Sequence, residues 1–314
     1  MSESMRPLSD AFAVTLGLIL GSFVNVCIYR LPRELSVVRP RSRCPACARS
    51  IPWYDNIPLL SFLVLRGRCR ACGASIAARY PLVEAGTALV SWVVFLRFGL
   101  GAEYLVYFLY AAALLTLSVV DLDYRIIPDE ISVYGLGVGL LLALCSPWLT
   151  LVDPLVSGWL QPAATGLTGE LQSLARSAGT GASGALGVLA ICVQATTTGL
   201  LRLLDSVVGM LVGGGFLYGV GALYEKARKQ EGIGGGDIKL MAMAGAFTGW
   251  EGALFTIFGG SLVASVVGVF LMARRRTGGQ TPIPFGPFLS AASFLYLLCG
   301  DRLIQSYLNL LRPL

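Results

Sequence analysis

Two acidic clusters give this sequence the means for acid–base chemistry, and both lie at the ends of apolar stretches. Asp237 follows a glycine-rich run, residues 232–236, and Asp121 and Asp123 close the apolar run 114–120. A carboxylate at membrane depth costs several kcal/mol, so such a group is by default a functional candidate. The chain has no histidine, which excludes imidazole catalysis and leaves a carboxylate pair sharing one proton. We therefore expect an aspartyl hydrolase working at a membrane.

Each of these acids also has a structural interpretation. For Asp129, just ahead of the next apolar stretch, helix capping is the expected role, and Asp237 could cap a helix in the same way. Asp121 lies closest to the apolar run and is the first candidate of its cluster. Gly234 and Gly236 favour a catalytic role for Asp237, because glycine allows close approach by a peptide substrate and unusual φ angles.

Four cysteines form a second constellation. Cys44 and Cys47, and then Cys69 and Cys72, make two Cys-x-x-Cys pairs separated by 21 residues. This spacing is close to that of a zinc ribbon, in which four thiolates close a tetrahedral shell around a structural zinc. Two disulfides or a redox pair are the alternatives, and a reducing cytoplasmic location favours zinc. The other cysteines lie in apolar surroundings and are expected in the core or facing lipid: Cys27, Cys145, Cys192 and Cys299.

The composition is that of a polytopic membrane protein. Of 314 residues, 55% are hydrophobic and 13% charged, against about 25% charged in soluble proteins. We expect an all-α fold of about eight transmembrane helices with a small cytoplasmic subdomain resembling a zinc ribbon. The first ten residues lack a basic signal-peptide region, so the first span is expected to stay in the protein. The expected spans are 10–28, 82–99, 103–120, 131–150, 206–224, 254–273 and 284–299, with a short one over 238–250.

Basic residues predict the orientation of these spans. Between Arg30 and Arg79 there are ten arginines and only two acids, and basic clusters also occur at 226–229 and 274–276. By the positive-inside rule all three regions face the cytoplasm, which places the N-terminus outside and both acidic clusters at cytoplasmic ends. The net charge of +6 follows from this orientation, and no pattern typical of nucleic-acid binding accompanies it.

The composition divides the chain into four regions. Residues 151–182 are rich in small and polar residues and suggest a loosely structured extracytoplasmic connection. Residues 183–204 are apolar but interrupted by Gln194, three threonines and Arg202, so we expect an interfacial or packed helix there. No internal repeat is expected. The regions are a first span with the cysteine loop, a first membrane block, an extracytoplasmic insertion and a second membrane block: 1–81, 82–150, 151–204 and 205–314.

These motifs together resemble those of type IV prepilin peptidases, which belong to the Gly-x-Gly-Asp intramembrane aspartyl proteases. The glycine-rich run with Asp237 resembles the Gly-x-Gly-Asp signature itself. The resemblance covers nearly the whole chain except about 151–204. The further matching stretches are 20–26 with 29–32, the two cysteine pairs, 56–61 with 79–84, 121–129 and 281–287.

The resemblance implies that Asp121 and Asp237 are the catalytic pair. It implies cleavage of a short basic leader after a glycine, in prepilins and in the pseudopilin precursors of type II secretion, at the cytoplasmic face of a bacterial inner membrane. It further implies N-methylation of the new N-terminus with S-adenosylmethionine as methyl donor. Supporting or substrate-binding residues are expected at Asp123, Gly234, Gly236, Lys239, Pro284, Gly286 and Glu84. The residues that would bind the donor are not evident in the sequence.

Two other classes of protein could use the same residues. A proton-coupled transporter could use Asp121 and Asp237 as relay carboxylates, but it would place them near mid-bilayer in repeat-related helices. A thiol oxidoreductase could use the cysteine pairs, but it would need them beside a quinone or an extracytoplasmic partner. The expected positions of the acids at cytoplasmic ends and of the thiols in an arginine-rich loop favour the hydrolase.

Overall fold

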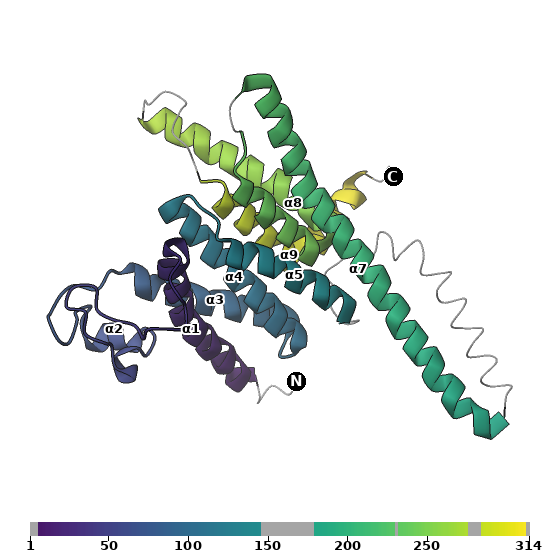
Figure 1. The fold of residues 1–314 in the computed structure, drawn as a ribbon, viewed down its shortest axis with the longest axis horizontal. Helices are drawn as coiled ribbons and strands as arrows, with labels where there is room; N and C mark the ends of the chain where they lie inside the picture. The colour runs from purple at the N-terminus through teal and green to yellow at the C-terminus, as the bar shows by residue number, and fades with distance from the viewer. Residues whose placement is uncertain (1–5, 146–178, 230–231, 276–283, 312–314) are drawn as a thin grey trace. The chain divides into compact units, whose positions relative to one another are not determined.

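Helices make up most of the computed structural model, which describes residues 6–145, 179–229, 232–275 and 284–311 (Figure 1). Within these ranges there is no β-strand, only the isolated bridges Arg43–Ser50 and Arg68–Ser75. The chain forms two compact units, Met1–Pro128 and Asp129–Leu314. The first unit carries Asp121 and the four cysteines, and the second carries Asp237.

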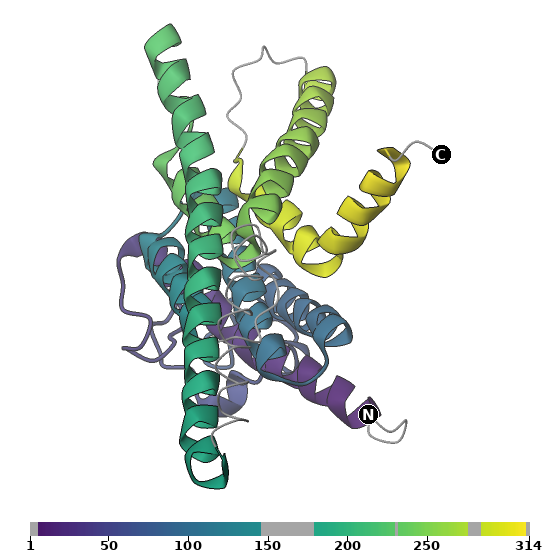
Figure 2. The ribbon, with the colours of Figure 1, turned by 90° about the vertical axis from the view of Figure 1, so that its right-hand side faces the viewer.

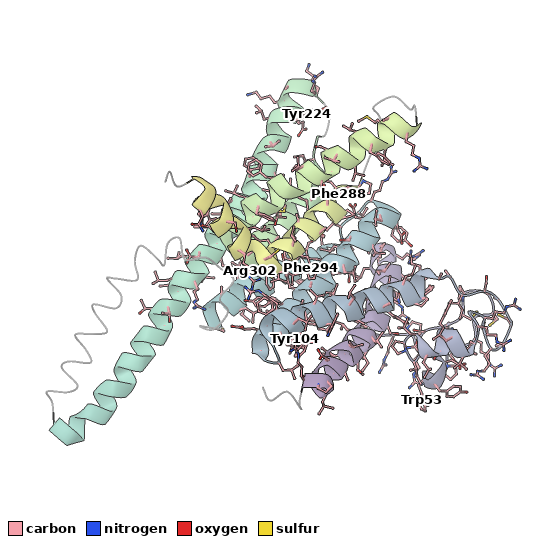
Figure 3. All side chains as sticks on the ribbon, turned by 180° about the vertical axis from the view of Figure 1, so that it is seen from behind. Trp53, Tyr104, Tyr224, Phe288, Phe294 and Arg302 are labelled. Carbon is pink, nitrogen blue, oxygen red and sulfur yellow. The ribbon has the colours of Figure 1, made fainter. Side chains whose placement is uncertain are left out.

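The first unit is built on three long helices, with the cysteine loop between the first two. Helices α1 and α3 pack closely because glycines on α1 face α3: a Cβ on Gly17 would lie 2.5 Å from Ala88 Cα, and one on Gly21 would lie 2.8 Å from Glu84 Cα. The buried Tyr104 ring of α4 stacks on Phe108, with centroids 5.8 Å apart (Figure 3). The elements are α1 (Arg6–Arg30), η2 (Leu31–Arg33), η3 (Trp53–Asp55), α2 (Leu60–Val64), α3 (Arg79–Phe98) and α4 (Ala102–Tyr124).

The second unit packs its helices around α8. A Cβ on Gly209 of α7 would lie 2.2 Å from the Gly245 carbonyl oxygen of α8, and one on Gly245 would lie 2.0 Å from that of Gly209. Small residues let two backbones approach in this way, and the Ser206 hydroxyl adds a 2.6 Å hydrogen bond to the Ala246 carbonyl. The elements are α5 (Asp129–Cys145), α7 (Gly179–Arg228), α8 (Gly235–Arg275) and α9 (Gly286–Leu311).

The apolar stretches expected to span a membrane lie within helices, apart from at most two residues at an end, wherever they are described. Helix α8 contains two of them, 238–250 and 254–273, and Gly249 interrupts it with φ 71°. In the described part of the chain, five helices are long and apolar enough to cross a bilayer: α1 with η2, α3, α4, the Thr196–Arg228 part of α7, and α8. Helix α5 and the apolar part of α9, Gly286–Gly300, are shorter. The all-helical membrane fold is therefore confirmed: the described residues give five helices of spanning length, and the remaining expected spans fall on α5, α9 and the second half of α8.

Helix α7 differs from the expectation for its region. Residues 183–204 do not form a separate helix but continue into the 206–224 stretch as one element of 50 residues (Figure 2). No proline occurs between residues 179 and 228, so nothing breaks the backbone hydrogen bonding there. At about 1.5 Å per residue the helix is about 75 Å long, more than twice a bilayer core. The expected loose connection over 151–182 lies, up to residue 178, outside the described residues.

Candidate functional site

Asp121 occupies the last turn of α4 and is buried, with 6% of its surface exposed. The helix ends just after it: Arg125 adopts a left-handed conformation and donates its backbone N–H to the Asp121 carbonyl at 2.9 Å. Burying a carboxylate at the end of an apolar helix is costly. The position therefore matches the functional candidate expected from the sequence.

Asp123, two residues further along, is exposed and forms an ion pair with Arg79 at the start of α3. A second arginine lies beside this turn, because the Arg33 guanidinium sits over the Tyr124 ring, 5.1 Å from its centroid. Arg79 and Arg33 were not singled out from the sequence as site residues. Both lie in the arginine-rich segment, but only the fold brings them to the end of α4.

Asp237 lies in the first turn of α8, which begins at Gly235. Its backbone N–H donates to the Gly234 carbonyl at 3.1 Å, and the side chain is half-buried. A helix N-terminus presents free backbone N–H groups that favour a nearby negative charge. The glycine-rich segment therefore leads directly into α8, the helix that carries the Asp237 carboxylate.

The glycines of this segment have a different role from the expected one. Gly234 and Gly236 do not adopt positive φ angles, so the expectation of unusual backbone angles there is wrong. The close approach is at Gly232, where a Cβ would lie 2.5 Å from Cδ1 of Tyr224. A Cβ on Gly234 would meet only the Asp237 carboxylate, at 3.7 Å. Packing against Tyr224, rather than backbone angle, requires glycine in this segment.

Lys239 and Asp129 connect the starts of two helices. The Lys239 ammonium lies 2.7 Å from both carboxylate oxygens of Asp129, the first residue of α5. Asp129 thus forms an ion pair with a residue two positions beyond Asp237, while its expected capping role stays a prediction. This contact fixes the beginning of α8 against the beginning of α5.

Glu84 is the sixth residue of α3, which begins at Arg79. It accepts a 2.9 Å hydrogen bond from the backbone N–H of Leu59 and another from the Ser22 side chain. Asn25, one turn along α1 from Gly21, donates to the Tyr80 carbonyl at 2.9 Å. These polar contacts hold the segment before α2 against α1 and α3.

Pro284 and Gly286 lie at the start of α9, whose first residue is Gly286. Residues 281–283 of the same motif lie outside the described part of the chain. The described part of the 281–287 motif therefore lies at the start of a helix. Proline is tolerated at such a position, where it interrupts no backbone hydrogen bond of the helix.

The four cysteines come together as expected. Their Sγ atoms all lie within 4.8 Å of one another. Tetrahedral zinc with Zn–S bonds of about 2.3 Å would hold its sulfurs about 3.8 Å apart, and Sγ of Cys44 lies 3.8 Å from that of Cys72. One compact set of four sulfurs fits a single metal ion better than two independent redox pairs.

The two cysteine pairs are copies of one structural unit, which contradicts the expectation of no internal repeat. Residues 43–51 and 68–76 share the same residue at six of nine positions. Their backbone bonds repeat as well: Ala48 N–H donates to the Cys44 carbonyl and Gly73 N–H to the Cys69 carbonyl, both at 2.9 Å. Ala48 and Gly73 also share a positive φ, 56° and 71°.

The thiols have unequal electrostatic surroundings. Backbone N–H groups of Cys47 and Ala46 stabilise the Cys44 thiolate and lower its pKa to about 6. At Cys72 the Ala74 N–H also favours the thiolate, but desolvation and the three neighbouring sulfurs outweigh it and raise the pKa to about 11. A cluster that crowds negative charge in this way is one that a divalent cation would stabilise.

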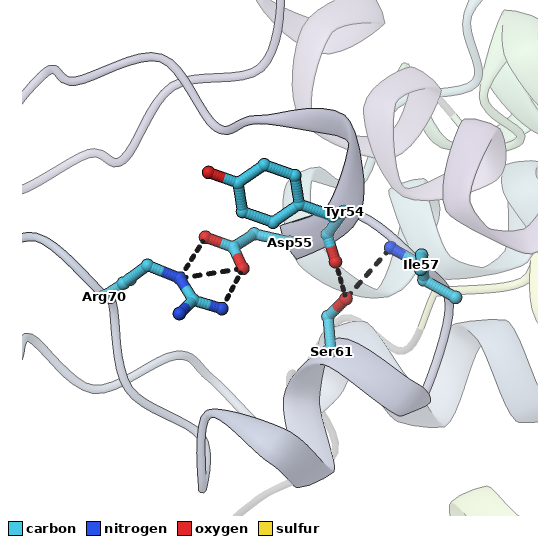
Figure 4. A network of polar contacts seen from close by, with 5 residues as sticks. All are labelled: Tyr54, Asp55, Ile57, Ser61 and Arg70. Atoms are coloured by element: carbon cyan, nitrogen blue, oxygen red, sulfur yellow. Dashed lines mark hydrogen bonds and ion pairs between the residues drawn. The ribbon is translucent and has the colours of Figure 1, made fainter.

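A polar network connects the two halves of the cysteine loop (Figure 4). Arg70, between the cysteines of the second pair, binds Asp55 through Nε at 2.9 Å and Nη2 at 2.6 Å, and this hydrogen bonding lowers the pKa of the Asp55 carboxyl. The Ser61 hydroxyl of α2 donates to the Tyr54 carbonyl and accepts from the Ile57 N–H, both at 3.0 Å. The segment between the two pairs is therefore folded onto them.

Sequence reasoning also missed Asp205, which is only 1% exposed inside α7. The sequence did mark this residue as unusual, since Asp205 is a lone acid just before the apolar stretch 206–224. Its position one residue before Ser206, which bonds α8, places it at the packed face of the helix.

Comparison with known proteins identifies two domain families along the chain. Residues 15–98 match the bacterial peptidase A24 N-terminal domain, and residues 180–269 match the type IV leader peptidase family. The first range includes the four cysteines and the second includes Asp237, while Asp121 lies between them. No solved structure matches the chain.

Curated relatives extend the similarity over most of the chain. A prepilin leader peptidase/N-methyltransferase of Pseudomonas putida is 32% identical, covering 95% of this chain and 93% of the relative. That of Stutzerimonas stutzeri is 33% identical over 96% of this chain and 94% of the relative. One from Myxococcus xanthus is 35% identical over 88% of this chain and 67% of the relative. The chain therefore belongs to the prepilin leader peptidase/N-methyltransferase family.

Proposed function

We propose that this protein is a membrane aspartyl endopeptidase that removes the short basic leader from type IV prepilins and pseudopilin precursors. The observation that carries the proposal is the 32% identity to a prepilin leader peptidase/N-methyltransferase over 95% of the chain. The two carboxylates at the ends of long apolar helices, Asp121 on α4 and Asp237 on α8, supply a chemistry consistent with it. We place cleavage after a glycine, at the cytoplasmic face of a bacterial inner membrane.

Asp121 and Asp237 are the proposed catalytic pair. One carboxylate takes a proton from water, which attacks the scissile carbonyl carbon, while the other, protonated, donates a hydrogen bond to the carbonyl oxygen. When the tetrahedral intermediate collapses, the C–N bond breaks and a proton passes to the leaving amine. The chemistry requires both carboxylates to reach one water molecule in the working enzyme.

The choice of Asp121 over Asp123 rests on their surroundings. Asp121 is buried at the helix end, whereas Asp123 is exposed and already paired with Arg79. The Arg79 guanidinium already occupies the Asp123 carboxylate, which leaves that carboxylate less accessible to a water molecule. We therefore assign Asp123 a role in fixing the turn or contacting the substrate.

The direct test of this function is co-expression with a model prepilin, followed by measurement of the mature protein's mass. Loss of the leader reports the peptidase, and an added methyl group on the new N-terminus reports methyl transfer. A prepilin that keeps its leader beside well-inserted enzyme would overturn the proposal. Replacing both aspartates with asparagine provides the matched inactive control.

N-methylation of the new N-terminus is the second proposed activity, supported by the name that the relatives share. It would use a methyl donor such as S-adenosylmethionine. The described residues do not single out a donor-binding site, so no step of the transfer is assigned to a residue. Glu84, a half-buried carboxylate in α3, is the first residue to test. A Glu84→Gln variant that still cleaves but no longer methylates would support its involvement.

We propose zinc as the structural metal of the cysteine loop, held by Cys44, Cys47, Cys69 and Cys72. Four thiolates leave no open coordination position, so the ion would organise the loop rather than catalyse. Metal analysis of the purified, reduced protein tests this, with about one zinc per chain expected.

The proposed orientation can be tested independently of activity. Both acidic clusters and the basic segments should face the cytoplasm, and the turn between α3 and α4 should face outward. The labelling of the native cysteines is measured first and subtracted. Leu100→Cys should then react with a membrane-impermeant reagent applied to intact cells, whereas Lys229→Cys should not. The reverse labelling pattern would invert the topology.

A further inference from the structure

The short helix α2 has its polar and apolar faces reversed relative to a helix in a water-exposed loop. Its buried residue is Ser61, whereas Leu60, Leu63 and Val64 are exposed, the last two by 71% and 67%. Positions 60, 63 and 64 follow helical spacing and share one face. Exposed apolar surface of this kind marks an interaction site rather than a solvated loop.

The same surface includes an aromatic residue from the preceding turn. Trp53 of η3 is 80% exposed, and η3 contacts α2 (Figure 3). The Ser61 hydroxyl, bonded to the Tyr54 carbonyl and the Ile57 N–H, fixes this turn to the inner face of α2 (Figure 4). We call Trp53, Leu60, Leu63 and Val64 the α2 patch. Its apolar side chains point outward because the polar contacts occupy the inside.

The height of the α2 patch relative to the membrane follows from one hydrogen bond. Leu59, immediately before α2, donates its N–H to Glu84 of α3 at 2.9 Å. Glu84 is the sixth residue of α3, so it lies about 7.5 Å from the start of that helix. Glu84 also bonds Ser22, two turns before the end of α1. Helix α2 therefore begins beside the terminal turns of two spans, not beyond them.

The charge around the α2 patch fits a lipid surface. Helix α2 itself carries no charged residue, and it is followed by the exposed Arg66 and Arg68. Trp at the headgroup level, aliphatic residues below it and arginines reaching to phosphate are the features of an interfacial helix. A peptide partner with a basic leader would instead meet like charge at these arginines.

We propose that the α2 patch docks the cysteine loop onto the anionic surface of the bilayer that holds α1 and α3. Trp53 and the Leu60, Leu63 and Val64 side chains enter the boundary between headgroups and acyl chains. Arg66 and Arg68 bind lipid phosphates. The loop is then held at three points: two spans and the patch.

The test uses the full-length protein in nanodiscs whose lipids carry bromine on the upper acyl chain. Bromine quenches nearby tryptophan, and the difference between wild type and Trp53→Phe isolates the Trp53 signal. We expect that signal to be strongly quenched, and more so with phosphatidylglycerol than with phosphatidylcholine alone. In Leu63→Glu it should shift to the red and lose its quenching.

Two controls keep the result interpretable. Val38→Glu adds the same charge at an equally exposed apolar residue of the loop outside the α2 patch, and it should leave Trp53 quenching unchanged. Metal content should remain that of the wild type in Leu63→Glu, which shows that the loop is still folded. Wild-type Trp53 that brominated lipid does not quench would overturn the proposal. So would a blue shift that occurs only when a prepilin is added, since that outcome identifies the patch as a substrate-docking surface.

Discussion

The cysteine loop and the two carboxylate sites reach their geometry by different routes. The four sulfurs converge because two similar nine-residue units fold alike and bring their cysteines together within one compact unit. Asp121 and Asp237 instead depend on where long helices end, in different compact units of the chain. Local spacing thus defines the first site, and helix boundaries and packing define the second.

The same difference appears in what supports each site. The loop is held by contacts between groups inside it, such as Asp55 and Arg70, which are 15 residues apart. The start of α8 is held by a residue distant in sequence, since Lys239 bonds Asp129, 110 positions earlier in the chain. If the comparison is right, damage to either site should leave the other folded.

The largest expected effect is that of removing either catalytic carboxylate. Asp121→Asn or Asp237→Asn should each lower the rate of leader cleavage by at least about 100-fold, because a shared-proton mechanism fails when one partner cannot ionise. Asp123→Asn should cost much less. Cleavage of a model prepilin in membranes measures these rates, and unchanged metal content shows that the loop is intact. Near-normal cleavage by Asp121→Asn together with loss in Asp123→Asn would reverse the assignment of the two acids.

Removing one thiolate should affect the loop alone. Cys44→Ser or Cys72→Ser should lower the metal content from about one ion per chain to near zero, because an incomplete ligand set binds far more weakly. Limited proteolysis should then cut within residues 34–78, while the helices of the second unit keep their protection. Disulfides in the purified wild-type protein would count against the metal site.

The sequence predicted the cysteine cluster well because its information is local. Cys-x-x-Cys spacing places two sulfurs on one turn whatever the rest of the chain does. The repeat of residues 43–51 and 68–76 was equally visible in the sequence and was missed. The short repeat escaped notice beside the long apolar stretches.

The supporting contacts of the carboxylates were not predictable in the same way. The apolar runs predicted the helices that carry Asp121 and Asp237, and the structure contains both of these helices, α4 and α8. The pairing of Asp123 with Arg79 and of Asp129 with Lys239 depends on which helix ends lie together, and one sequence does not contain that information. The continuity of α7 was also missed: polar residues such as Arg202 argued against a membrane span over 183–204, and the helix expected there was treated as separate from the stretch 206–224, although no proline divides them.

A moderate effect is expected where α7 crosses α8. Gly209→Ala would place a methyl group 2.2 Å from the Gly245 carbonyl oxygen, and such overpacking costs about 1–3 kcal/mol of unfolding free energy. Gly215→Ala on the same helix meets no atom within 4 Å and should stabilise by about 0.5–1 kcal/mol. Denaturant titration in detergent compares the two. Equal effects would show that the close crossing does not hold the second unit together.

The smallest expected effect distinguishes the two copies within the cysteine loop. Ala48 and Gly73 occupy equivalent positions with φ 56° and 71°, and a left-handed conformation costs a residue with a Cβ about 1–2 kcal/mol. Ala48→Gly should therefore stabilise the metal-bound loop by up to about 1 kcal/mol, and Gly73→Ala should destabilise it by a similar amount. The concentration of chelator that removes half of the metal measures both changes. If both substitutions weaken metal retention, the two units do not share one backbone geometry, and the local origin of the cysteine site has to be abandoned.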